Sequence, residues 1–213
     1  MTDSAQTSTA ATDSAYDVVS STTHYAGRVI TLRCDEVRMP DGRIVVRELI
    51  EHPGAVGVVA LDDNERVLMI RQYRPAVRTY LWELPAGLLD EPGESAIDAA
   101  ARELAEEVGI SALRWEVLVD VRSSPGMTDE AYRVYLARGL SAKPHDFTAG
   151  PDEEADMQEQ WVPLSAAVDR VLAGEITNGL AVAGILAADL ARQRGYAGLR
   201  ATSADWPARP NHA

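Results

Sequence analysis

The sequence contains little cysteine, no long apolar run and no excess of positive charge, and each shortage excludes a class of protein. Its single cysteine, Cys34, rules out an internal disulfide and a multi-cysteine metal site, as is typical of a reducing compartment. No apolar segment approaches the roughly 20 residues of a membrane span. Residues 1–17 lack the basic start and apolar centre of a signal peptide. We therefore expect a cytoplasmic protein that makes no contact with a membrane.

Basic residues are outnumbered, with 20 Lys and Arg against 33 Asp and Glu, which makes the formal net charge −13. Such a field repels polyanions, and no Lys/Arg run or basic stripe interleaved with aromatic residues offsets it locally. We therefore expect no nucleic-acid partner. A small anionic substrate remains compatible with this charge where a few arginines and a bound cation neutralise it.

The composition of the chain is typical of a globular protein: 213 residues, of which 46% are apolar and 25% charged. Residues 1–17 are rich in Ser, Thr and Ala and are predicted to be a disordered tail. Residues 18–52 are predicted to form a small antiparallel β unit around a turn-like Met-Pro-Asp-Gly sequence. Residues 53–195 form the main domain, and a tail over 196–213 follows, in which Trp206 is large enough to pack onto the body.

The periodicity of apolar residues predicts an α+β domain with several strands and few helices. We expect strands over 29–33, 44–50, 55–61, 67–73, 115–121, 132–140 and near 160–162, and helices over 96–108, 164–172 and 178–194. The helix over 96–108 is bounded by Ser95 as a cap and by Gly109 as a stop.

That helix separates its residues into an apolar face and an acidic face. The apolar arc contains Ile97, Ala101, Leu104 and Val108, and the opposite side contains Glu103, Glu106 and Glu107. Three carboxylates within five residues repel one another, and a bound cation would reverse that cost. Two interpretations remain open on periodicity alone: a solvated acidic face, or a site for Mg²⁺ or Mn²⁺, which prefer hard oxygen ligands.

A longer string around the helix resembles the Nudix box. Residues 87–94, then seven residues, then 102–110 reproduce its pattern of Gly, Glu and Arg-Glu-apolar-any-Glu-Glu-any-Gly-apolar. Every specified position from Glu94 onward matches. One departure is present: six residues instead of five separate Gly87 from Glu94, as if Pro92 had been added.

The resemblance implies a Nudix α/β/α sandwich with a mixed sheet, preceded by a small N-terminal antiparallel sheet that relatives use to form a homodimer with exchange between subunits. It also implies two or three Mg²⁺ or Mn²⁺ ions. By the same resemblance, Glu103 and Glu107 are the principal metal ligands, with Glu106 as an additional one and Ala86 as a ligand through its backbone oxygen. Arg102 and Glu94 are then a structural pair that orients the loop.

The general base that activates water is expected in the acidic loop 152–156. Taken alone, an acidic loop of this kind is more often a solvated surface segment. The chain resembles the ADP-ribose pyrophosphatase branch, which places a catalytic glutamate in a late loop, and on that ground Glu154 is favoured over Glu153.

Substrate preference is indicated outside the box. A proline 15 residues after Ile110 resembles the segment that accompanies ADP-ribose specificity, although a Pro-Gly pair is otherwise only a turn. The implied substrate contacts are Pro125, Gly126, Glu130, Arg74, Arg47 and Glu48. Arg74 would hold the diphosphate. The pair at 47 and 48 would contact adenine, in the neighbouring subunit's site if a dimer forms, or would be a surface cross-strand pair.

The sequence thus predicts metal-dependent hydrolysis of ADP-ribose to AMP and ribose 5-phosphate. One alternative is a Nudix pyrophosphatase acting on other nucleotide sugars or on a damaged nucleoside triphosphate. Another is a non-enzymatic ADP-ribose sensor, which the intact box carboxylates and the acidic net charge disfavour.

Overall fold

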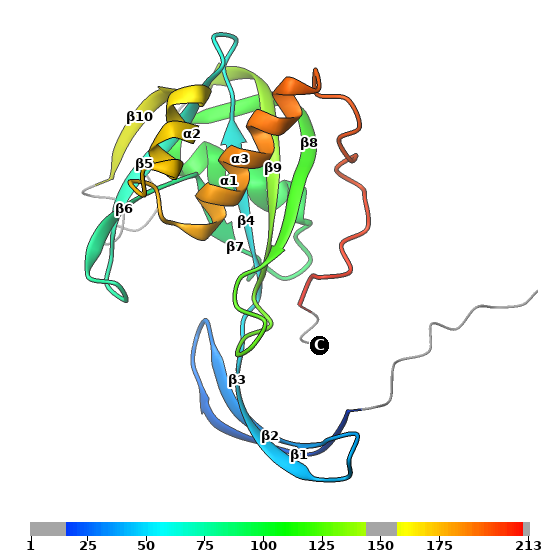
Figure 1. The fold of residues 1–213 in the computed structure, drawn as a ribbon. Coiled ribbons are helices and arrows are strands. Elements are labelled where there is room, and N and C mark those ends of the chain that lie inside the picture. Colours follow the sequence, from blue (N-terminus) through cyan, green and yellow to red (C-terminus); the bar gives the residue numbers. More distant parts are fainter. Residues whose placement is uncertain (1–15, 144–156, 211–213) are drawn as a thin grey trace, which may run out of the picture.

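The computed structural model describes residues 16–143 and 157–210. Its elements follow along the chain (Figure 1) as β1 Asp17–Ala26, β2 Thr31–Arg38, β3 Ile44–Glu51, β4 Ala55–Ala60, β5 Arg66–Arg74, β6 Thr79–Glu83, β7 Ala86–Leu88, α1 Ala96–Val108, β8 Ile110–Arg122, β9 Ala131–Ala142, β10 Gln158–Pro163, α2 Leu164–Leu172 and α3 Gly179–Gln193. The predicted α+β class is confirmed. Within these two ranges, no helix is long and apolar enough to cross a membrane.

The first three strands form an antiparallel sheet that lies apart from the rest of the chain in Figure 1, below the body. The predicted small sheet is confirmed, but the apolar pattern does not predict β1, and β2 continues five residues beyond the expected 29–33. All ten residues of β1 are exposed, so this strand has no buried face that would produce an alternating pattern. Backbone pairing with β2 holds it in place. The predicted tail over 1–17 lies mostly outside the described residues, and its last residue, Asp17, begins β1.

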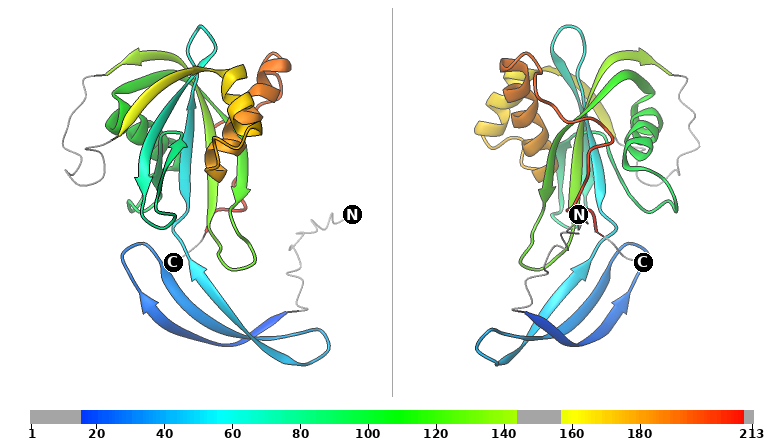
Figure 2. Two further views of the ribbon diagram at one scale, coloured as in Figure 1. Left: turned by 60° about the vertical axis from the view of Figure 1, so that its left-hand side comes forward. Right: turned by 90° about the vertical axis from the view of Figure 1, so that its right-hand side faces the viewer.

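The body is a three-layer α/β/α arrangement. One sheet has the order β7-β4-β9-β8, the other β10-β5-β6, and β4 runs parallel to β9 while the remaining pairs are antiparallel. In Figure 2 the sheets lie in the middle, with α1 on one side and α2 and α3 on the other. The predicted sandwich with a mixed sheet is confirmed. The short strands β6 and β7 were not expected, because they are only five and three residues long and offer too little pattern.

Strand β4 contributes to hydrophobic clusters on both faces of its sheet. Val56, Val58 and Ala60 pack toward α1, and Val59 packs toward α3, all with no exposed surface. The sequence of a strand that is covered on both faces is a continuous apolar run, without alternation of apolar and polar residues. This is why the sequence predicts a core strand here.

The bounds of α1 agree with the predicted 96–108. The side chain of Ser95 accepts a hydrogen bond from the backbone N–H of Asp98, and Gly109 ends the helix in a left-handed conformation with φ 60°. The buried face is centred on Ala100 and Leu104, whereas Ile97, which was expected in the apolar arc, is only half-buried. One face of α1 is therefore anchored in the core, and the side chains of the opposite face are left for contacts outside the core.

The C-terminal segment beyond α3 returns along β8 and β9 (Figure 1). The backbone N–H of Val117 donates to the carbonyl of Arg200 at 2.9 Å. Arg133, which is 2% exposed, donates to the carbonyls of Ala204 and Asp205 at 2.8 and 2.9 Å, and its guanidinium lies 4.9 Å from the centre of the Trp206 ring. The prediction that Trp206 packs onto the body is confirmed.

Replacement of Arg133 should measurably destabilise the fold. Arg133→Met removes both bonds to Asp120, at 2.7 and 3.0 Å, and leaves the carbonyls of the C-terminal segment without a donor. Removing one partner of a buried ion pair costs about 3 kcal/mol, so we expect the melting temperature to fall by roughly 10 °C. Thermal unfolding checks this, with Arg114→Met on the exposed side of β8 as the control. Equal melting temperatures for the two variants would contradict the anchoring role.

Candidate active site

A cavity of about 750 Å³ lies against the acidic face of α1. Its walls come from both sheets, from α1, from the loop before β9 and from the first residues of α3. Five predicted site residues line it: Arg74, Ala86, Glu103, Glu107 and Glu130. Residues separated by up to 56 positions in the chain thus share one hollow.

The β7 segment approaches α1 closely on the cavity wall. The carboxylate of Glu107 accepts a hydrogen bond from the backbone N–H of Ala86 at 3.0 Å. A Cβ atom at Gly87 would lie 2.0 Å from Oε1 of Glu103, which is closer than any non-bonded contact allows. Because Oε1 is the end of a flexible side chain, a Cβ atom at position 87 would displace the carboxylate of Glu103. The β7 segment therefore contacts both principal candidate ligands.

Substitution at Gly87 should therefore disturb the candidate ligands more than the fold. Gly87→Ala forces Glu103 to move, and a misplaced group in an active site costs roughly 10²-fold in rate. We expect that loss in kcat/KM for a diphosphate substrate, measured alongside the melting temperature. Gly93→Ala is the comparison variant. It adds the same carbon atom at an exposed turn where no other atom lies within 4 Å of it. Normal kcat/KM in Gly87→Ala would contradict the assignment of Glu103.

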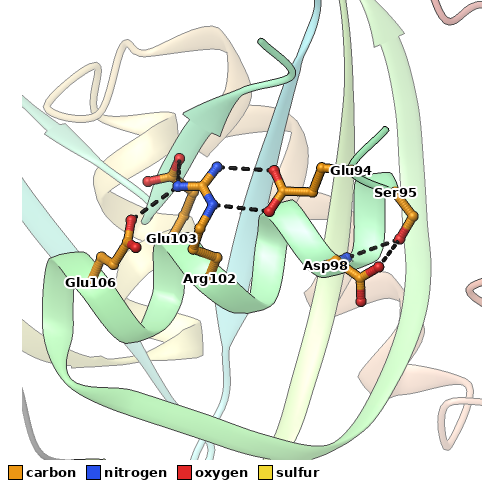
Figure 3. A network of polar contacts seen from close by, with 6 residues as sticks. All are labelled: Glu94, Ser95, Asp98, Arg102, Glu103 and Glu106. Carbon is orange, nitrogen blue, oxygen red and sulfur yellow. Dashed lines mark hydrogen bonds and ion pairs between the residues drawn. The ribbon is translucent and has the colours of Figure 1, made fainter. Parts of the chain in front are cut away.

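Arg102 is the centre of a polar network on α1 (Figure 3). Its Nε and one terminal nitrogen donate to the two oxygens of Glu94 at 2.9 and 3.1 Å, and the other terminal nitrogen donates to Glu103 and Glu106, each at 2.9 Å. The hydrogen bond to Glu94 is the foremost cause that raises the pKa of Arg102 above its usual value. The structure thus pairs Arg102 with Glu94. It also directs the carboxylate of Glu106 toward the arginine, and Glu106 does not line the cavity described above.

Glu103 carries a charge that its surroundings disfavour. Burial raises the pKa of its carboxyl group, and the nearby carboxylates of Glu106 and Asp90 raise it further. Arg102 lowers it, but the pKa of Glu103 remains above its usual value. A divalent cation at this wall would stabilise the ionised form of Glu103. The electrostatics of the wall therefore fit a cation.

The side chains that could bind a cation here do not form a closed cage around one point. Among residues 16–143 and 157–210, no three acidic, histidine or cysteine side chains already converge on one point. Mg²⁺ is commonly held by one or two carboxylates together with water and substrate phosphates, so a closed cage is not needed. Glu103, Glu107 and Ala86 all line the cavity, where their oxygen atoms would suit such an ion.

Arg74, on β5, also lines the cavity, and it forms an ion pair that the sequence does not predict. Its Nε and one terminal nitrogen donate to Glu83 at 2.9 and 2.6 Å. Glu83 is 2% exposed and also lines the cavity. The sequence signal is a charged residue inside an otherwise mostly apolar run, which does not show its partner.

Glu130 and His52 line the end of the cavity nearest the N-terminal sheet. Glu130 accepts a hydrogen bond from the hydroxyl of Ser123, and one of its oxygens lies 3.9 Å from Nε2 of His52. His52 was not predicted, because 78 positions separate it from Glu130. Pro125 and Gly126 lie in the exposed turn between β8 and β9 and do not line the cavity.

Other predicted site residues do not belong to this cavity in the described chain. Arg47 and Glu48 are on β3, exposed, in the separate N-terminal sheet, where Glu48 is opposite Cys34 in β2. The candidate bases Glu153 and Glu154 lie outside the described residues. The structure of this chain therefore brings Glu103 and Glu107 together with Arg74, but not with the pair at 47 and 48.

Comparison with known proteins decides the family. The model for the NUDIX domain matches residues 51–179, which is more than half of the chain. The chain belongs to the Nudix family. The model for the nucleoside diphosphate sugar hydrolase N-terminal domain matches residues 16–50 of this Nudix protein.

Several relatives of this Nudix protein are similar over much of their length. The ADP-ribose pyrophosphatase of Mycobacterium tuberculosis is 49% identical over 92% of this chain and 93% of that protein. The methanol dehydrogenase activator of Bacillus methanolicus is 39% identical over 63% of this chain and 72% of that protein. A solved structure described as an ADP compounds hydrolase has the same fold, with a TM-score of 0.72 at 22% identity, over 84% of this chain and 96% of that one.

The extra residue in the Nudix box is accommodated without disturbing α1. Pro92 and Gly93 form an exposed turn, closed by a hydrogen bond from the N–H of Glu94 to the carbonyl of Glu91 at 3.2 Å. Gly93 has φ 82°, which favours glycine. The insertion thus bulges into solvent before Glu94, and the pairing of Glu94 with Arg102 is kept.

Proposed function

We propose that this Nudix protein hydrolyses ADP-ribose to AMP and ribose 5-phosphate with the help of divalent cations. The observation that carries the proposal is one cavity whose lining includes the two carboxylate residues Glu103 and Glu107 together with Arg74. A diphosphate is a polyanion, and such a cavity binds it through cations and a planar donor fork. The 49% identity to an ADP-ribose pyrophosphatase supports the choice of substrate.

Two or three Mg²⁺ or Mn²⁺ ions would be held by Glu103 and Glu107, with Glu106 and the backbone oxygen of Ala86 as further ligands. When bound, such ions screen the phosphate oxygens and lower the pKa of a coordinated water. To act as a ligand, Glu106 would have to release Arg102, because its carboxylate accepts a hydrogen bond from that arginine at 2.9 Å. Arg102 keeps Glu103 oriented through the remaining bonds of its network.

The proton of the attacking water would go to Glu154, with Glu153 as the second candidate. The water oxygen would then bond to one phosphorus while the bond from that phosphorus to the bridging oxygen breaks. The bridging oxygen stays on the other phosphate, and the products are the monoesters AMP and ribose 5-phosphate. Arg74 would bind the diphosphate, and Glu130, which follows the turn at Pro125 and Gly126 in the chain, would accept from hydroxyl groups of the substrate. The cytoplasmic location expected from the sequence stays a prediction.

The N-terminal sheet supports a homodimer in which the subunits exchange this unit. It exposes large apolar side chains, including Val18 and Val46 at 58% and Tyr25 at 59%, which a small sheet does not leave in water without a partner. We propose that a second copy of the chain covers them. Arg47 and Glu48 of the partner subunit then contact the adenine.

Disruption of this sheet should separate the subunits. For Val46→Asp we expect light scattering to show one copy of the 23.0 kDa chain, where the native protein shows two. The affinity for ADP-ribose should fall with it, because each site loses the adenine contacts of its neighbour. Leu113→Asp, at an 85% exposed residue of β8, is the control. A native monomer with full activity would overturn the proposed dimer.

The substrate is tested with a panel of ADP-ribose, other nucleotide sugars and nucleoside triphosphates, each with Mg²⁺. We expect release of AMP from ADP-ribose with the highest kcat/KM. Preference for another nucleotide sugar or for a damaged triphosphate would establish the rival Nudix activity. Tight binding of ADP-ribose without any metal-dependent release of AMP would establish the sensor instead.

A further inference from the structure

Glu83 is a buried carboxylate at the end of β6, and its interactions extend into the cavity. It is 2% exposed, and it accepts two hydrogen bonds from Arg74, at 2.9 and 2.6 Å. Nε2 of Gln72 is 3.5 Å from the same carboxylate. A buried charge is costly unless it is paired and hydrogen-bonded, so Glu83 keeps its place only with Arg74 beside it.

The pairing follows from the register of two strands. Glu83 is opposite Ile70, and Leu81 is opposite Gln72, in the antiparallel pair of β5 and β6. Side chains two positions apart share a face, so Gln72 and Arg74 lie on the same face as Glu83. Arg74 reaches back along β5 over Gln72, and its side chain remains 42% exposed at the cavity.

The geometry of the pair restrains the guanidinium plane. Glu83 engages the edge formed by Nε and one terminal nitrogen, which uses two of the five N–H donors of an arginine. A bidentate pair of this kind fixes orientation as well as distance. The other terminal nitrogen is at the far corner of the planar group, pointing away from the carboxylate.

Glu83 is also tied to the metal-ligand wall through a short stretch of backbone. Three residues after it, the N–H of Ala86 is bound by Glu107 at 3.0 Å, and the next residue, Gly87, contacts Glu103. Between them, the carbonyl of Pro85 accepts from the N–H of Val58 at 2.8 Å. Residues 83–87 thus connect Arg74 rigidly to the acidic face of α1.

We propose that Glu83 is a positioning residue, which holds the guanidinium of Arg74 at a set distance and angle from Glu103 and Glu107 so that a diphosphate spans the two. Glu83 itself does not touch the substrate. This inference rests on the proposed hydrolysis of a nucleoside diphosphate derivative, but not on the identity of the group attached to the diphosphate.

A double-mutant cycle tests whether Glu83 acts through Arg74. We expect Glu83→Gln to raise KM about tenfold with kcat changed less than threefold, since the diphosphate is charged in both the ground state and the transition state. In an Arg74→Ala background, the same substitution should cost nothing further, because the carboxylate then has no arginine to orient. A tenfold loss in both backgrounds would overturn the proposal.

A matched variant separates positioning from stability. Asp120 forms a bidentate pair with the buried Arg133, at 2.7 and 3.0 Å, and neither residue lines the cavity. Asp120→Asn should also lower the melting temperature while leaving KM unchanged. An equal rise in KM for both variants would mean that the loss is general destabilisation, and would overturn the proposal.

Binding of a non-hydrolysable diphosphate keeps this test independent of turnover. Calorimetry with α,β-methylene-ADP and Mg²⁺ should show the same cycle: about tenfold weaker binding for Glu83→Gln, and none of that loss in the Arg74→Ala background. If native protein binds this analogue but releases no AMP from ADP-ribose, the proposed function fails while the cycle still decides the role of Glu83. Absence of any binding by the native protein would overturn the inference about Glu83.

Discussion

Glu107→Gln is expected to lower kcat/KM for ADP-ribose by about 10³-fold at saturating Mg²⁺. A bound cation contributes several kcal/mol to the stabilisation of a phosphoryl transition state, and about 4 kcal/mol corresponds to that loss at 1.36 kcal/mol per tenfold. The fold should persist, because the amide oxygen of glutamine still accepts the hydrogen bond from the N–H of Ala86. Steady-state kinetics and thermal unfolding of the same preparation measure both.

The control for this variant is Asp63→Asn, which removes one negative charge from the exposed turn between β4 and β5. We expect it to retain native kcat/KM. A loss below tenfold in Glu107→Gln would mean that Glu107 is not a principal metal ligand. A lower melting temperature without a kinetic effect would make it a structural partner of β7 only.

Glu154→Gln is expected to lower kcat by about 10²-fold while the affinity for Mg²⁺ stays close to native. A positioned general base contributes roughly this factor, and glutamine keeps the size of the side chain but cannot take the proton from water. The two quantities are separated by measuring kcat at saturating substrate across a Mg²⁺ titration.

Glu153→Gln is the matched comparison for this second variant, since it makes the same chemical change one position earlier in the loop. We expect its kcat to remain within about threefold of native. Near-normal turnover in Glu154→Gln would move the role to Glu153 or to another residue, and a large loss of Mg²⁺ affinity would make Glu154 a metal ligand instead of the base.

The elements that the sequence predicts well are those whose signals are local. The bounds of α1 follow from Ser95, Gly109 and a 3.6-residue period, all within fifteen positions. Strands β4 and β5 are predicted because burial on both faces leaves a continuous apolar run. In contrast, β1 is held by its neighbour and has no buried face, so its residues show no alternation of apolar and polar side chains.

The candidate site divides in the same way. Glu103 and Glu107 could be predicted because one helical turn places them on the same face of α1. The ion pair between Arg74 and Glu83 could not, because it depends on the register of β5 with β6, and a shift of one residue would turn the side chains to the other face. The contact of His52 with Glu130 similarly depends on the parallel pairing of β4 with β9.

By itself the sequence determined the acidic face of α1, the arginine and glutamate that flank it, and the family resemblance, since spacing along one helix sets which residues are neighbours. Only the tertiary structure decided that Glu83 pairs with Arg74, that the backbone at Gly87 lies close to the carboxylate of Glu103, and that Pro92 lies in an exposed turn. The first two depend on contacts between segments that are distant in the sequence. The free energy of such contacts comes from burial and pairing, which no local pattern records.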